Sequence, residues 1–375
     1  MQVSIKEVKT RRELRKFASY PNVLYKDCPY YVPQIISMEM DTLDRKKNHA
    51  FEVCESKYFL AYDSNGKIVG RSAAIINHRY NKKVNERLCR MSWIDFVEDY
   101  DVFKALMDAV AEYAREKGMD TLAGPLGFLE FDVAGIVIEG FDRLPTAYGK
   151  YNYPYYDEFF TRYGFRKDSD YVEFIIKVPD GETIERYKRA SKIVSERYGI
   201  RQAELPNKKA IAPYLDGVFS CMNRAYSKLH GYSEMSPGQI EDLKKQFLPN
   251  INVDYISILL NSDDKVIGFG VGMPSLAKAM QKAKGHMFPF GWIHMLRALK
   301  HNDTFDALLI AVDDDYLNSG ATSMIFEKIY SGLIRHGIKY VESTRELEDN
   351  LKMQNLWNKM DYELVKRART YTKEL

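Results

Sequence analysis

The 375-residue chain is poor in cysteine. It has four, Cys28, Cys54, Cys89 and Cys221, and no two of them have CxxC spacing. Zinc sites and disulfide frameworks both need cysteines at short or regular spacings. The sequence therefore argues against a metal site and against a disulfide-stabilised secreted protein, and it favours a reducing, cytoplasmic compartment.

The chain also lacks long apolar runs and a strong charge of either sign. No apolar stretch approaches the ~18 residues that span a bilayer, and the amino-terminal segment MQVSIKEVKTRRELRK lacks the apolar region of a secretory signal. The net charge is +3, whereas domains that bind nucleic acid concentrate positive charge on one face. We therefore expect a small-molecule partner rather than a membrane or a nucleic acid, and self-association stays open.

Glycine is scarce in the one segment that would need it to hold a phosphate. Residues 308–326 read LLIAVDDDYLNSGATSMIF, which predicts a buried strand, a polar loop and the start of a helix. Such junctions bind phosphates through backbone N–H groups, and their loops usually contain several glycines. Here the loop has only Gly320. It is either an altered phosphate loop or an ordinary capped helix start.

What the chain does contain is an internal repeat. Residues 58–70 (YFLAYDSNGKIVG) and 255–268 (YISILLNSDDKVIG) each read as a β-hairpin. An amphipathic helix and a strand follow in both halves, at 102–124 and 321–344, with Gly118 and Gly337 placed to end the helices. Each half closes with a helix, a turn and a strand, at 153–178 and 350–374.

The repeat divides the chain into two similar parts. We expect an N-terminal domain over residues 1–178, a polar linker helix over 179–199 and a C-terminal domain over 200–375. The first half carries an insertion at 124–151 and the second at 274–304.

This module order resembles the GCN5-related N-acetyltransferase (GNAT) fold. That family carries a glycine-containing loop for the CoA pyrophosphate and an Asn-x-x-Ala-x-x-x-Tyr-x-x-x-Gly-Phe helix whose Tyr often acts as general acid. In the second half, Asn350 matches the Asn, Met353 the Ala and Trp357 the Tyr. In the loop, Val312 closes the strand, and Leu317 and Asn318 replace the usual Arg-Gly. Gly320 matches the middle glycine and Thr322 the last small position.

A closer resemblance covers nearly the whole chain. YYVPQI, KIVGRSAAIIN, GPLGF, YNYPYYDEFFTRYGF, FPFG and LEDN are similar, in this order, to landmarks of a bacterial family of tandem GNAT proteins. The resemblance implies an α+β fold of two tandem GNAT-like domains. Each would be a mixed, mostly antiparallel sheet flanked by helices.

The same resemblance implies acetyl-CoA or another acyl-CoA as co-substrate. The acidic run 313–315 would repel a pyrophosphate if it pointed inward, but backbone amides and hydroxyls of the loop remain. The corresponding first-half segment, 96–106, has no glycine and predicts a degenerate copy. The candidate cofactor-binding residues are Val312, Asp313, Asn318, Ser319, Gly320, Ala321, Thr322 and Trp357.

The chemistry of transfer is less clear from the residues. An indole N–H is a hydrogen-bond donor and not an acid, so Trp357 cannot replace the family's Tyr. We name Glu342, Thr344 and Asn350 as candidate catalytic residues. The acidic turn RELEDN either holds a cationic substrate, through Glu346, or is a solvated turn capped by Asn350. The candidate substrate pocket also includes Tyr153, Tyr155 and Tyr156, which could alternatively be core.

Three functions fit these observations. The first is an acyl-CoA-dependent N-acyltransferase, by its resemblance an N-acetyltransferase, that moves the acyl group directly to a small amine. The second is a non-catalytic protein that binds an acyl-CoA or another small ligand on the same scaffold. The third is an aminoacyl transferase of the Fem type, against which the near-neutral charge counts.

Overall fold

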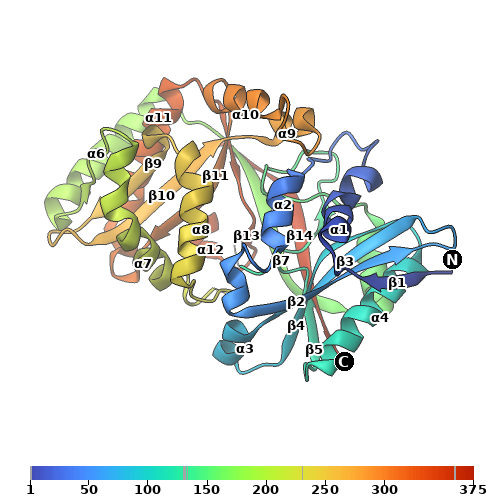
Figure 1. The fold of residues 1–375 in the computed structure, drawn as a ribbon. Coiled ribbons are helices and arrows are strands. Elements are labelled where there is room, and N and C mark those ends of the chain that lie inside the picture. The colour runs from blue at the N-terminus through green and yellow to red at the C-terminus, as the bar shows by residue number, and fades with distance from the viewer. Residues whose placement is uncertain (1, 130–131, 133, 230, 359) are drawn as a thin grey trace.

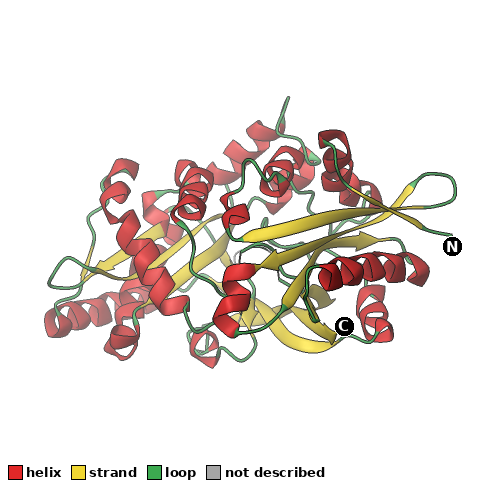
Figure 2. Ribbon diagram, turned by 60° about the horizontal axis from the view of Figure 1, so that its bottom comes forward, coloured by secondary structure: helices red, strands yellow, loops and turns green. Residues whose placement is uncertain are grey.

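The computed structural model describes residues 2–129, 132, 134–229, 231–358 and 360–375. Strands from both halves of this described chain join in one 14-stranded sheet, in the order β1-β2-β3-β4-β5-β14-β7-β12-β11-β10-β9-β8, with β13 beside β7 and β6 beside β14. Figure 2 shows helices on both sides of this sheet.

The first half contains the hairpin expected at residues 58–70. β2 and β3 pair antiparallel, and β4, buried along its whole length, pairs with β3. The strands of this half are β1 (Ser4–Glu7), β2 (Cys54–Tyr62), β3 (Ile68–Asn77), β4 (Leu88–Phe96), β5 (Thr121–Gly124), β6 (Ile136–Glu139) and β7 (Arg166–Lys177). Its helices are α1 (Arg11–Leu24), α2 (Ile36–Leu43), η1 (His49–Glu52), α3 (His78–Val84), α4 (Tyr100–Glu116) and α5 (Tyr155–Tyr163).

The second half repeats this plan, with its own hairpin of β9 and β10. Its strands are β8 (Arg201–Gln202), β9 (Ile256–Leu260), β10 (Val266–Pro274), β11 (Thr304–Val312), β12 (Tyr340–Ser343), β13 (Glu346–Leu347) and β14 (Tyr362–Glu374). Its helices are α6 (Gly181–Tyr198), η2 (Lys208–Tyr214), α7 (Leu215–Tyr226), α8 (Pro237–Phe247), η3 (Leu248–Asn250), η4 (Val253–Tyr255), α9 (Ala277–Ala283), α10 (Gly291–Lys300), η5 (Asp314–Ser319), α11 (Ala321–Arg335) and α12 (Leu351–Gln354).

The two long helices that follow the hairpins form for the reasons read from the sequence. Asp99 caps α4 by accepting a hydrogen bond from the backbone N–H of Asp101, and Leu106 and Val110 are fully buried against the sheet. Burial of one such side chain stabilises the fold by about 1.5–3 kcal/mol. Gly118 and Gly337 follow α4 and α11 at φ +72° and +73°, a left-handed conformation that glycine adopts without strain.

The closing strands of the two halves are exchanged. β7, the last strand of the first half, pairs with β12 and β13 of the second half. β14, the last strand of the chain, pairs with β5 and β6 of the first half. The two closing strands also pair with each other, in the middle of the sheet. The halves therefore share one continuous sheet.

The segment expected to be a linker is helix α6, and it packs against α11. Tyr187 of α6 contacts Phe326 and Tyr330, with ring centroids 5.8 and 6.3 Å apart. Val194 joins the apolar core beneath α11. Among the described residues, no helix is both long and apolar enough to cross a bilayer.

Candidate functional site

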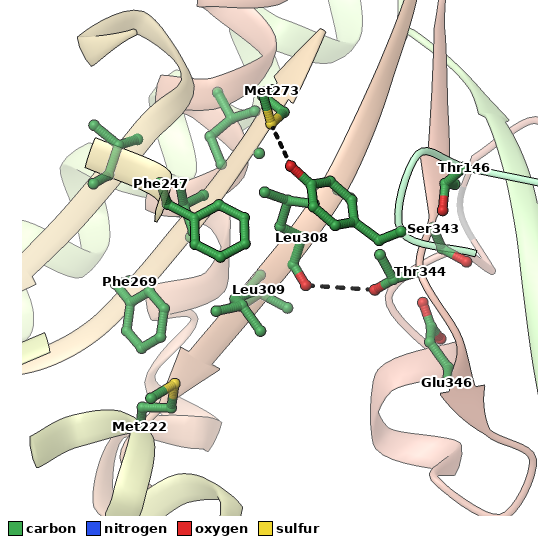
Figure 3. A pocket seen from close by; sticks show the side chains of 18 of the residues that line it. Thr146, Met222, Phe247, Phe269, Met273, Leu308, Leu309, Ser343, Thr344 and Glu346 are labelled. Atoms are coloured by element: carbon green, nitrogen blue, oxygen red, sulfur yellow. Dashed lines mark hydrogen bonds between the residues drawn. The ribbon is translucent and has the colours of Figure 1, made fainter. Parts of the chain in front are cut away.

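A cavity of about 380 Å³ lies in the second half, against the segments that adjoin the first. Most of its wall is apolar. Figure 3 shows Met222 of α7, Phe247 of α8, Phe269 of β10 and Leu309 of β11 around it. Many polar side chains of the lining come from the first half and from the segment around β12 and β13, while Lys244 of α8 and Tyr226 of α7 also line the cavity. The first group includes Asp132, Thr146, Tyr148, Glu173, Ser343, Thr344, Arg345, Glu346 and Asn350.

The cavity reaches the point where β11 and β12 part. These parallel strands pair only from Thr304 opposite Tyr340 to Ala307 opposite Ser343. At the next residue, Leu308, the pairing of β11 with β10 also shifts register, as in a β-bulge. A bulge bends its strand away from the ladder. Thr344 Oγ donates to the carbonyl oxygen of Leu308 at 3.4 Å across the opening, as Figure 3 shows.

Glu346 is the acidic side chain at this opening. The Nε1–H of Trp357 donates to both of its carboxylate oxygens, at 3.1 and 3.3 Å. Burial raises the pKa of Glu346 to about 7, and hydrogen bonds from Trp357 and Ser343 oppose that rise. Near neutral pH the carboxyl group therefore exists in both protonation states and can accept or release a proton.

A buried ion pair connects the cavity to the first half. Arg345 Nε donates to Glu173 Oε1 on β7 at 3.0 Å, and both side chains are about nine-tenths buried. Arg345 also donates to the backbone carbonyl oxygens of Ala134 and Gly135. Removing one member of such a pair would leave an uncompensated buried charge. The pair holds the 343–346 segment against the first half.

The three candidate catalytic residues have different positions. Thr344 and Asn350 both line the cavity. Asn350 also caps α12, because its side chain accepts a hydrogen bond from the backbone N–H of Met353. Glu342 is outside the lining, between Val341 and Ser343, which belong to it. Successive side chains of a strand point to opposite faces, so Glu342 points away from the cavity.

The candidate cofactor loop forms a capped helix start. The Ser319 hydroxyl accepts a hydrogen bond from the N–H of Ala321, and Gly320 has φ +85°. Asp313 pairs with Arg224 at 2.7 Å, and Lys228 pairs with Asp314 at 2.7 Å. The two carboxylates nearest the strand are thus neutralised by cations. The cavity lining includes Trp357 but not Val312, Asp313, Asn318, Ser319, Gly320, Ala321 or Thr322.

The three first-half tyrosines lie away from the cavity, in the core of their own half. The Tyr156 hydroxyl accepts from the N–H of Phe96, and the Tyr155 hydroxyl donates to the carbonyl oxygen of Phe96 at 2.6 Å. Tyr153 packs against the same core. β4 pairs with β5 only from Leu88 to Arg90. The hydroxyls of Tyr155 and Tyr156 therefore lie at the end of β4 that does not pair with β5. In the second half the corresponding end of β11 borders the cavity.

Several lining residues were not expected from the sequence. α7 contributes an apolar stripe, and the first half contributes Tyr148 and Glu173. The sequence signal for α7 is its i, i+3, i+4, i+7 spacing. The stripe consists of Leu215, Val218, Phe219 and Met222.

Comparison with known proteins gives two relatives. No family model matches the chain. It is 24% identical to Protein YghO of Escherichia coli over 371 residues, 97% of this chain and 94% of the relative. It is 25% identical to Bacterial ceramide synthase of Caulobacter vibrioides over 301 residues, 80% of this chain and 77% of the relative.

Solved structures resemble the chain over its full length. A tandem GNAT protein from the clavulanic acid biosynthesis pathway superposes with TM-score 0.58 at 12% identity, covering 100% of this chain and 98% of the other. A GCN5-related N-acetyltransferase from Sphaerobacter thermophilus superposes with TM-score 0.52 at 8% identity, covering 99% and 95%. These likenesses confirm the fold expected from the sequence: the chain is a tandem GNAT-fold protein.

Proposed function

We propose that this protein is an acyl-CoA-dependent N-acyltransferase that moves the acyl group directly from CoA to an amine. The observation that best supports this proposal is the place of Glu346. It lies at the polar end of an apolar cavity, where β11 and β12 part. An ammonium group must lose a proton before its nitrogen can attack a thioester. A carboxyl group with a pKa of about 7 can take that proton at neutral pH.

The proposed reaction assigns roles to the residues at the opening. The Glu346 carboxylate takes the ammonium proton and releases it to solvent, and the neutral amine nitrogen then attacks the thioester carbonyl carbon. The carbon–sulfur bond breaks, and the CoA thiolate leaves with the second proton from the nitrogen. Backbone N–H groups of β11 beyond Ala307 polarise the carbonyl oxygen. Trp357 orients the Glu346 carboxylate through its two hydrogen bonds.

The wall of the cavity favours an acyl chain longer than acetyl. Phe219, Met222, Phe247 and Leu309 offer hydrocarbon surface and no hydrogen-bond partner for a polar substrate. Burying alkyl groups there is favourable by about 0.8 kcal/mol per CH₂. One curated relative is named as a ceramide synthase, and ceramides are long-chain amino alcohols acylated on nitrogen. We therefore infer a fatty acyl-CoA as donor and a long-chain amine as the preferred acceptor.

The residues near α11 fit the anionic part of CoA. The helix start at Ala321 carries fixed positive partial charge. Arg224 and Lys228, which pair with Asp313 and Asp314, place two cations beside the same loop. A pyrophosphate approaching the loop would therefore meet these cations as well as the acidic residues.

The proposal is tested by measuring the free CoA thiol that the purified protein releases from acyl-CoA donors. Acetyl-, octanoyl- and palmitoyl-CoA are each supplied with a long-chain amino alcohol or with a short amine. We expect the highest kcat/KM for the long donor. Glu346→Gln keeps the size of the side chain but removes the base, and we expect it to lower kcat/KM by about 10²–10⁴-fold. Glu348→Gln, in the same turn but outside the lining, is the matched control. Equal rates for the two variants would contradict the role of Glu346.

The second candidate is a non-catalytic protein that binds an acyl-CoA. Trp357 in the place of the family's acidic Tyr, and the cap that Ser319 makes on α11, favour it. Calorimetric titration with palmitoyl-CoA separates the two candidates. Binding without thiol release from any donor and acceptor would support the second candidate and contradict the enzyme.

A further inference from the structure

The insertion of the second half carries an exposed apolar patch that the proposed reaction does not use. We define the patch as Phe288, Phe290, Trp292 and Leu296, whose exposed fractions are 79%, 67%, 42% and 50%. Trp292 and Leu296 are one turn apart on α10 and so lie on the same face of the helix. Large apolar side chains gathered on an exposed surface mark an interaction site.

The patch is held by a well-packed base. Ala283 of α9 and Met295 of α10 are buried in a small core with Ile35 of the first half. The Gln281 side chain donates to the backbone carbonyl oxygens of Pro29 and Tyr31, at 2.8 and 3.0 Å. The exposed side chains thus lie on the outer side of a helical hairpin, and its inner side packs against the first half and hydrogen-bonds to it.

The indole of Trp292 is fixed as well. Its Nε1–H donates to the carbonyl oxygen of Pro289 at 2.9 Å. Pro289 lies between Phe288 and Phe290, so this bond ties the helix to the aromatic turn that precedes it. The aromatic rings of the patch are therefore presented by a defined turn.

The charge of this segment favours an anionic partner. Between Ala277 and Asn302 there are five Lys and Arg residues and no Asp or Glu, although the whole chain has a net charge of only +3. All five cations are exposed, and Lys300 lies one turn after Leu296 on the same face of α10. The five are Lys278, Lys282, Lys284, Arg297 and Lys300.

We propose that the α9–α10 hairpin docks the protein on the surface of an anionic lipid bilayer. Aromatic and leucine side chains enter the interfacial region of a membrane, while Lys and Arg side chains pair with anionic headgroups. α10 has 10 residues, so it would lie along the surface. The lack of a long apolar run, from which no membrane partner was expected, concerns spanning segments and not surface binding.

This inference is independent of the proposed catalysis, because vesicle binding needs no acyl transfer. It also suits the lipid-like substrates proposed above. The core beneath the hairpin includes Tyr148, which lines the cavity. Docking by the patch would therefore bring one wall of the cavity close to the bilayer.

The test is sedimentation of the full-length protein with vesicles. One set is a mixture of phosphatidylglycerol and phosphatidylcholine, and the other is phosphatidylcholine alone. We expect binding to the anionic vesicles that weakens as salt is raised. Phe290→Ser combined with Trp292→Ser should weaken it by about tenfold or more, and so should Lys282→Gln combined with Lys284→Gln and Lys300→Gln. Ile193→Ser, which removes an apolar side chain 61% exposed on α6, is the matched control and should bind as wild type.

Three results would overturn the proposal. The first is no binding of the wild-type protein to either vesicle. The second is equal binding by the patch variants and the control, with thermal unfolding showing that all are folded. The third is a patch that holds two copies together: sedimentation velocity would then show a dimer that Phe290→Ser with Trp292→Ser converts to monomer, with vesicle binding unchanged.

Discussion

At the scale of single residues, Trp357 and Glu346 have complementary places in the proposed proton transfer: Trp357 orients the carboxyl group, and Glu346 accepts the proton. The indole cannot give up a proton at neutral pH, but its N–H holds the carboxylate in the cavity wall. Burial and hydrogen bonding act in opposite directions on Glu346 and leave its pKa at about 7. In the proposed reaction, Trp357 would act as a positioning residue for Glu346, the base on the neighbouring turn.

Changing Trp357 should shift the pH dependence of the reaction. Trp357→Phe removes a donor that stabilises the Glu346 carboxylate, so the pKa of Glu346 should rise above about 7. The base acts only when deprotonated, so the rise of kcat/KM with pH should move to higher pH. The measurement is kcat/KM against pH for both proteins. Trp292→Phe is the control. If the pH profile of kcat/KM were the same for Trp357→Phe and wild type, Trp357 would not stabilise the Glu346 carboxylate.

At the scale of the element, strand β11 has two different faces. One borders the cavity, and the other carries Asp306, which is fully buried. The nearest hydrogen-bonding groups, Ser275 and the backbone of Ala147, oppose a rise in its pKa, but within the described chain neither makes a well-formed hydrogen bond to Asp306. Burial, and the nearby Glu342 on β12, raise the pKa of Asp306 to about 8. An acid with a raised pKa stabilises the fold only while it remains protonated.

Asp306 should therefore make stability depend on pH. Unfolded Asp has a pKa of about 3.9, so between about pH 4 and 8 the folded protein binds the proton more tightly. The contribution of Asp306 to the free energy of unfolding then falls as pH rises, by up to about 1.4 kcal/mol per pH unit. Asp306→Asn removes this dependence and should gain stability relative to wild type from pH 5.5 to pH 8. Urea unfolding at both pH values measures it; an unchanged difference between the two proteins would refute it.

The elements differ in whether they could be predicted from the sequence. The hairpins and the helices α4 and α11 were predictable, because their periodicity and their end signals are local. The wall formed by α7 and β11 was not, since an apolar stripe does not reveal whether it faces a neighbouring side chain or a cavity. Glu173 and Arg345 are 172 positions apart and meet only in the folded sheet.

At the scale of the whole molecule, the exchange of β7 and β14 joins the two halves. Each closing strand has its neighbours in the other half, and both lie in the middle of the sheet. The sequence could not show this, because the pattern of each strand is the same whichever half it pairs with. The predicted boundary at residue 178 therefore divides the chain where the sheet is continuous.

Neither half should fold alone. Residues 1–178 without β14 would leave β5 with an unpaired edge and β7 with no partner, and unpaired edges favour aggregation. We expect residues 1–178 and 179–375 to be insoluble when expressed separately and soluble when expressed together. The full chain should unfold in one transition in urea. A cooperative unfolding transition for residues 1–178 alone would contradict the prediction.

The exchange also has a consequence for synthesis on the ribosome. Domains usually fold in the order in which they emerge, the amino-terminal one first. Here β5 receives its neighbour β14 only after residues 371–374 have been made. The first half must therefore wait, with part of its sheet open, until β14 has emerged. We expect chaperones that shield nascent polypeptides to cover the open edge of β5 during that interval.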